Sequence, residues 1–313
     1  MKIITSKILL VAGILFSLPS WAQRQSIIRD SIKEYYEIIN NAELSIIDSN
    51  YRNASKLYAK AFALKYPNGK DLYNGFMVSY FLQDTFQSKK YLIQLAQNGL
   101  KKQFILHNGR ALETPFFNYL SKDYDSIYNN FQTIKASRKI IALDSLGFID
   151  QMILKSDTNL SAAEIKHLQF QNLDRLKNWI TKNGFPSFKN TGFYEDYNPS
   201  PRTLPTDWYL LWHVRPSATQ LDDTYKNAVL AGDFRPDLYA LIIDQRGEHY
   251  WTLLPRDFKE SINKYKINDA RKQIYLESID DYIEKIKFSF HNKDFIFLNI
   301  FSILLNKDKL SIK

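Results

Sequence analysis

Cysteine is absent from the 313 residues of this chain. Its absence excludes disulfide bonds, a thiol nucleophile and a lipid anchor on cysteine, so stability has to come from packing. The apolar runs are short, and none reaches the roughly 20 residues that a membrane-spanning helix needs. The formal net charge is +9, but the basic residues are scattered among 33 acidic ones and form no long block. Such scattering is typical of a solvated surface.

Residues 1–22 have the layout of a secretory signal peptide. Two lysines precede or border the apolar stretch Ile8 to Leu18, and small residues precede Gln23. We therefore expect cleavage after Ala22 and export to the periplasm or, alternatively, to the outside of the cell. In an exported protein a positive charge favours anionic envelope surfaces, so we expect no nucleic-acid partner, and no membrane span after cleavage.

Small and aromatic residues recur at helical spacing in two copies, 35 residues apart. The first copy comprises Tyr51, Ala54, Tyr58 and Ala61, and the second comprises Phe86, Lys89, Ile93 and Ala96. This spacing places each set on one face of a helix, and a period near 34 is typical of stacked helix pairs. The stretch resembles tetratricopeptide repeats, although Lys89 stands where they carry a small residue. We expect a repeat domain over 23–135 that binds an envelope protein or peptide, or that only packs against the rest of the chain.

The remaining sequence predicts a second, mainly helical domain over 143–290. Ser161 and Glu164 form a capping box that starts a helix, and Gly184 and Pro186 end it. The segment 248–255, EHYWTLLP, has strand-like composition. The expected fold class is therefore mainly α, with tetratricopeptide-like hairpins followed by a helical domain with minor β. We expect the apolar tail, 291–313, to pack on this second domain, with a membrane-surface or partner-binding role as the alternative.

The stretch DWYLLWHVRPSATQ, at 207–220, contains the histidine best suited to catalysis. His213 could act as a general acid or base because its pKa lies near neutral pH, with Asp244 or an acid at 222–223 to orient it. The candidate ligand-contacting residues are Trp208, Gln220, Arg246 and Tyr250. No metal-ligand spacing accompanies His213, and we expect neither a metal nor a cofactor. The alternative, which we prefer, is a buried histidine that bonds backbone carbonyls.

Scattered residues between Leu143 and Phe288 follow an order that is also found in other proteins. They are Arg175, Leu176, Lys177, Gly184, Phe185, Pro186, Trp208, His213, Gln220, Gly232, Asp237, Leu238, Asp244, Tyr250, Thr252, Asn268, Arg271, Leu276 and Tyr282. In this order the chain resembles a bacterial family of uncharacterised function. Its members are common in envelope proteins of Bacteroidetes-type bacteria, behind tetratricopeptide-like repeats.

The chain departs from that family at two glutamine positions, which here hold Trp212 and Leu253. A polar pocket built on those glutamines would have lost both donors. The resemblance implies a location and a layout but no activity. Because no catalytic signature is present, the sequence favours an exported, non-catalytic binding or assembly protein of the envelope. The alternative is an envelope hydrolase that uses His213.

Overall fold

The computed structural model describes residues 21–108, 114–137, 140–155, 160–193, 206–214, 218–247, 250–254 and 263–298. The expected signal peptide therefore lies almost entirely outside the described residues. The same holds for the end of the apolar tail, 299–313.

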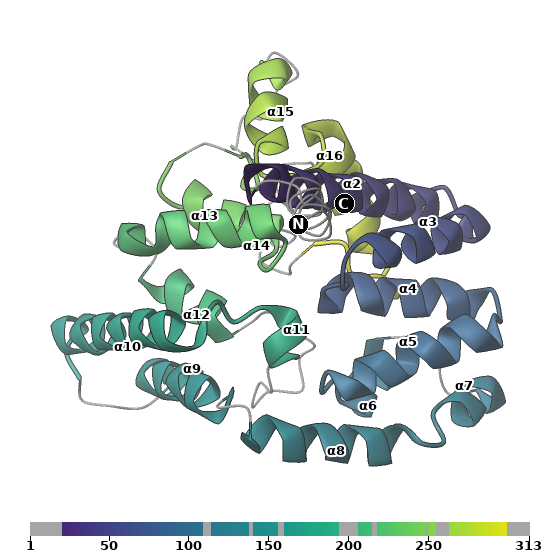
Figure 1. Cartoon of the computed structure of the whole chain (residues 1–313), viewed down its shortest axis with the longest axis horizontal. Helices are drawn as coiled ribbons and strands as arrows, with labels where there is room; N and C mark the ends of the chain where they lie inside the picture. Colours follow the sequence, from purple (N-terminus) through teal and green to yellow (C-terminus); the bar gives the residue numbers. More distant parts are fainter. Residues whose placement is uncertain are drawn as a thin grey trace, which may run out of the picture.

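The described chain is mainly α, as expected (Figure 1). Its helices, in chain order, are α2 (Trp21–Ile47), α3 (Tyr51–Leu64), α4 (Gly69–Phe81), α5 (Thr85–Gln97), α6 (Lys102–Asn108), α7 (Pro115–Leu120), α8 (Tyr124–Ser137), α9 (Ile140–Lys155), α10 (Ala162–Asn183), α11 (Phe188–Thr191), α12 (Thr206–His213), the 3-10 helix η1 (Ala218–Leu221), α13 (Asp222–Ala231), α14 (Pro236–Asp244), α15 (Lys264–Lys272) and α16 (Ile279–His291). Helices α2 to α8 stack on one side of the molecule, and α9 to α14 lie on the other.

The expected short strand at 248–255 is wrong for its described part, 250–254, which contains no strand. The backbone amides of Tyr250 and Thr252 bond to the carboxylate of Asp244, at 2.8 and 2.6 Å, instead of to a neighbouring strand. Trp251 adopts a positive φ of 58°, which interrupts an extended backbone. Local side-chain bonding has therefore replaced sheet pairing here.

The helical hairpins repeat every 34 residues, not every 35. The buried face of α3 holds Ala54, Tyr58 and Ala61, and the equivalent buried residues of α5 are Ser88, Leu92 and Leu95. Ser88 is thus the small residue of α5 that corresponds to Ala54 of α3, and Lys89 does not occupy that position. Phe86, which matches Tyr51 only by residue type, is 74% exposed.

The turns that enter α3 and α5 follow the same period. Ser49 and Gln83 have positive φ values of 58° and 55°, and the N-cap residues Asn50 and Asp84 follow them. Each N-cap side chain accepts a hydrogen bond from an amide in the first turn of its helix. Equivalent local chemistry therefore sets equivalent helix starts.

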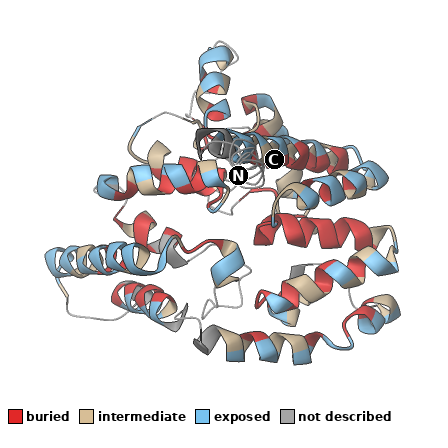
Figure 2. Cartoon of the chain, viewed as in Figure 1, coloured by how far each residue is buried: buried red, intermediate tan, exposed pale blue. Residues whose placement is uncertain are grey.

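Helix α4 lies at the centre of the first half and is buried almost all round (Figure 2). It packs between α3, α5 and the described part of the apolar tail. This tail was expected to pack on the second domain, but Phe295 stacks on Tyr51 and lies against Phe81, with ring centroids 6.0 and 5.7 Å apart. The side chain of Asn74 also bonds both the amide and the carbonyl of Ile296, at 2.8 and 2.7 Å. The tail thus completes the first core, although Phe297 also stacks on Phe288 of α16.

The two apolar cores do not follow the expected boundary at residue 143. The first combines buried residues between Tyr35 and Tyr124 with Leu254, Ile267 and the buried face of α16. The second combines α9, α10 and α12 to α14 with Ile274 and Leu276. The last part of the expected 143–290 domain therefore belongs to the first core, which holds the two halves together.

A buried ion network joins α16 to the first hairpins. The carboxylate of Glu43 lies 2.6 Å from the ammonium of Lys70 and 2.6 Å from that of Lys285. Burial would lower the pKa of Lys70, but Glu43 and Asp71 outweigh it and raise that pKa above its ordinary value. Glu277 lies 3.7 Å from Lys285, so each buried ammonium has a carboxylate partner. Such a network favours one arrangement of the helices, because separating a partner would leave a buried charge alone.

Candidate functional site

His213 at the end of α12 pairs with Asp150 of α9. The ring Nδ1 and the carboxylate Oδ2 form a short hydrogen bond. The Asp150 side chain is 1% exposed and the His213 side chain is 17% exposed, so solvent reaches the imidazole but not its partner. The second oxygen of Asp150 has no hydrogen-bond partner among the described residues. The pair orients the imidazole and also ties α12 to α9.

The carboxylate that orients His213 is therefore Asp150, whereas the sequence predicts Asp244 or an acid at 222–223. The preferred alternative, ring bonds to backbone carbonyls, is also wrong for Nδ1. Asp244 instead accepts bonds from the Tyr250 amide and from both the amide and the hydroxyl of Thr252. Asp150 could not be predicted from the sequence, because 63 residues separate it from His213 and only the packing of α9 on α12 brings the two together.

The predicted ligand-contacting residues fill structural positions. Trp208 is fully buried, and its indole N–H donates to the carbonyl of Leu238 at 3.1 Å. Arg246 holds the carboxylate of Asp222 at 2.5 and 2.6 Å. Gln220 is exposed on η1. Tyr250 is half-buried beside Tyr239, and its carbonyl accepts a bond from Arg271 at 2.6 Å. These contacts hold the second core together and do not surround His213.

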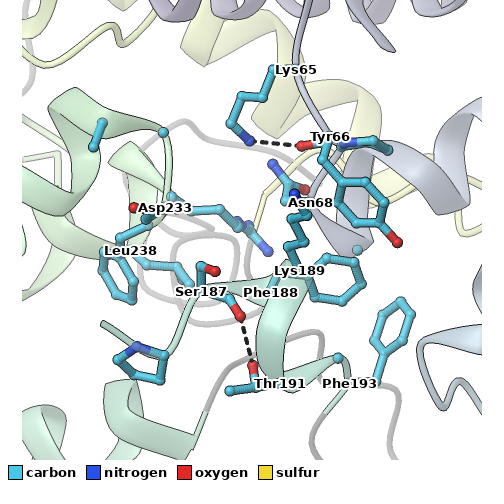
Figure 3. Close-up of a pocket in the computed structure, with 18 of the residues that line it drawn as sticks. Lys65, Tyr66, Asn68, Ser187, Phe188, Lys189, Thr191, Phe193, Asp233 and Leu238 are labelled. Atoms are coloured by element: carbon cyan, nitrogen blue, oxygen red, sulfur yellow. Dashed lines mark hydrogen bonds between the residues drawn. The ribbon is translucent and has the colours of Figure 1, made fainter. Parts of the chain in front are cut away.

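A cavity lies elsewhere in the described chain, where three turns meet (Figure 3). They are the α3–α4 turn, at 65–69, the segment around α11, at 186–193, and the α13–α14 turn, at 231–235. The cavity has a volume of about 230 Å³. This is slightly below the roughly 300–1,000 Å³ that are usual for sites of drug-sized ligands. It therefore suits a group the size of a single ring.

Two glycines allow these turns to approach one another. A side chain at Gly69 would place its Cβ 2.6 Å from the ring of Phe193, which is too close for any residue but glycine. Gly232 ends α13 in the left-handed conformation, with φ 77°, and its backbone passes against Ile32 and the Lys65 side chain. The cavity thus depends on the absence of side chains at both turns.

Hydrogen bonds hold the cavity wall that lies against the first half. The amide of Phe193 donates to the carbonyl of Asn98 at 2.7 Å, which attaches the α11 segment to the end of α5. The Asn98 side chain in turn donates to the hydroxyl of Tyr66 at 2.8 Å. On the α11 side, the Thr191 hydroxyl donates to the carbonyl of Ser187 at 3.1 Å. The lining is thus held in place by bonds that do not involve a ligand.

The lining includes five aromatic and three cationic side chains. Phe188, Phe193 and Tyr66 present rings (Figure 3). Arg235 is buried and holds Asp237 through two bonds of 3.0 and 2.6 Å, so its charge is already balanced. Lys189 is exposed at the rim, and Lys65 reaches in from the end of α3.

This cavity could not be predicted from the sequence. Pro186, Gly232 and Leu238 line it and stand in the order that carries the family resemblance, but nothing in that order places the three together. Lys65 gave no signal because it follows an ordinary amphipathic helix. Cavities of this kind arise from turns that are distant in sequence.

Neither a metal site nor a membrane span is found in the part of the chain that the structure describes. There, no group of three or more histidine, aspartate or glutamate side chains lies close enough to hold a metal ion. None of the helices in the described ranges combines the length and the apolarity that crossing a bilayer requires.

No protein-family model matches the chain, and no curated protein or solved structure is significantly similar to it. The resemblances to tetratricopeptide repeats and to the envelope family therefore stay predictions.

Proposed function

We propose that the protein is an exported, non-catalytic binding protein of the bacterial cell envelope, and that the cavity between the three turns receives its ligand. It acts in the periplasm or, alternatively, outside the cell, in keeping with the signal-peptide layout of residues 1–22. The observation that carries the binding role is the cavity itself. It is formed by the fold, lined by rings and cations, and held by hydrogen bonds within the protein. Preformed apolar cavities with a few polar groups are typical of ligand sites.

A steric variant at the cavity mouth tests this role. Ala231 is exposed at the end of α13 and lines the cavity, so Ala231→Phe would place a ring over the opening while burying no new polar group. Ala163, an exposed alanine in the first turn of α10, provides the matched control Ala163→Phe. Ligand-observed NMR with single-ring acids, amides and alcohols is the assay. We expect binding to the wild-type chain and to Ala163→Phe, and its loss in Ala231→Phe. Equal binding by both variants, or no binding by the wild-type chain, would contradict the proposal.

The pairing of His213 with Asp150 favours a second candidate, an envelope hydrolase. A buried carboxylate that orients a partly exposed imidazole is an arrangement that serves a general base. Hydrolysis of a p-nitrophenyl ester measures this activity. His167, exposed on α10, gives the control His167→Gln for the background reaction of any surface histidine. If His213→Gln and His167→Gln retain the same rate as the wild-type chain, the hydrolase is excluded as an esterase.

A further inference from the structure

Lys65 carries an ammonium group without a carboxylate partner. Among the described residues, no carboxylate oxygen lies within 4.0 Å of its Nζ. The Nζ donates one hydrogen bond, to the carbonyl of Tyr66 at 3.0 Å, and lies 4.7 Å from the centre of the Tyr35 ring. Its aliphatic chain packs against the backbone of Gly232. A cation held among rings and backbone in this way is only partly compensated.

The acidic groups around Lys65 are committed or solvated. Asp71 of α4 is buried, and its carboxylate accepts bonds from Tyr35 and Asn68 at 2.6 and 2.7 Å. Asp237 of α14 pairs with Arg235. Asp233, in the α13–α14 turn, is exposed at the cavity rim. Tyr36 of α2 and Lys189 of α11 also line the cavity, and neither can supply a negative charge at neutral pH.

The chemistry of the ligand follows from these surroundings. The rings of Phe188, Phe193 and Tyr66 would pack against an aromatic group, and the cavity volume of about 230 Å³ has room for one ring. A carboxylate next to that ring would provide Lys65 with its missing counter-charge. We infer that the ligand of this cavity is a small aromatic monocarboxylate whose carboxylate pairs with the ammonium group of Lys65. This inference rests on the proposed binding function and specifies its ligand class.

Titration of Lys65 gives the inference a distinctive pH dependence. Burial lowers the pKa of Lys65 to about 8, although Asp71 and Asp233 act in the opposite direction. A bound carboxylate favours the ammonium form and would raise this pKa. Affinity should therefore stay constant below about pH 8 and fall about tenfold per pH unit above it, because the free amine must first take up a proton.

The test compares phenylacetate with phenylacetamide, which has the same ring but no charge, by calorimetric titration of the full chain. We expect the acid to bind at least about tenfold more tightly than the amide to the wild-type chain and to the exposed-lysine control Lys56→Met. In Lys65→Met the two probes should bind equally. Lys65→Arg should keep the preference for the acid but lose its decline above about pH 8, since arginine stays charged.

Four outcomes would overturn the inference. Equal binding of acid and amide to the wild-type chain would do so while leaving the binding function intact, whereas failure of both probes to bind would count against both proposals. A preference for the acid that persists in Lys65→Met would assign the charge to another residue. A peptide that ends in phenylalanine with a free carboxylate, if it binds more than about tenfold tighter than phenylacetate, would make the ligand a chain terminus and not a free acid.

Discussion

Replacement of Lys65 by methionine should make the protein more stable at neutral pH. The difference between the ordinary lysine pKa of 10.5 and the value of about 8 in the folded chain corresponds to about 3 kcal/mol. Methionine fills similar space but loses the hydrogen bond to Tyr66, worth about 1 kcal/mol. It also loses the attraction of the charge to the Tyr35 ring, worth about 0.5–1 kcal/mol. We therefore expect a net gain of about 1–2 kcal/mol in the free energy of unfolding.

This gain should shrink as the pH rises. Between about pH 8 and 10.5 the unfolded chain keeps the Lys65 proton that the folded chain has released, so folding becomes more favourable with increasing pH. The methionine variant lacks this contribution. Between about pH 7 and 9.5 the wild-type chain should therefore gain about 2 kcal/mol relative to Lys65→Met.

Urea unfolding of the two proteins at these two pH values measures the effect, and Lys56→Met, at an exposed position of α3, is the control. All other groups titrate alike in the wild-type and variant chains, so the difference between them isolates Lys65. The reasoning would be refuted by a Lys65→Met protein that is less stable at both pH values. A stability difference that does not change with pH would refute it equally.

Three further changes test the packing around the site. Glu43→Gln leaves two buried lysines without their shared counter-charge and should lower the free energy of unfolding by about 3 kcal/mol. The control Glu34→Gln, in an exposed ion pair, should lower it by less than about 1 kcal/mol in the same urea assay. Equal losses of stability would contradict the role of the network. Gly232→Ala should lower stability by about 2 kcal/mol because φ is 77° and the methyl group meets Lys65, and an unchanged melting temperature would argue against this turn geometry. Asp150→Ala removes the partner of His213, so it should lower the free energy of unfolding by about 1–3 kcal/mol and speed amide hydrogen exchange in α9 and α12. Unchanged protection of these amides from exchange would mean that the pair does not tie the two helices together.

Helix ends were the features best predicted from the sequence, because their chemistry is local. Ser161 and Glu164 form the expected capping box, in which each side chain accepts a bond from the other residue's backbone amide. Gly184 caps the end of that helix, as expected, and Pro236 occupies the first turn of α14, a position that suits proline because its amide would be unbonded there. In each case the residues that decide the structure lie within one helical turn of one another.

Register and long-range pairing were predicted less well. The repeat was set at 35 residues because Phe86 resembles Tyr51 in type, whereas burial places Ser88 opposite the small position of α3. Residue type alone cannot tell which of two adjacent positions faces a neighbouring helix. The pairing of Asp150 with His213 depends in the same way on how α9 packs against α12.

The most direct measurement of the central claim is an NMR titration of the labelled chain with phenylacetate, followed at the backbone amides. Glycine amides occupy a sparse region of the spectrum, and Gly69, Gly192 and Gly232 all line the cavity. We predict that these three signals shift together and saturate at the same ligand concentration, while Gly247, which follows the C-terminal end of α14 and does not line the cavity, stays in place. Saturable shifts confined to residues around His213, with the three cavity glycines unchanged, would contradict the account.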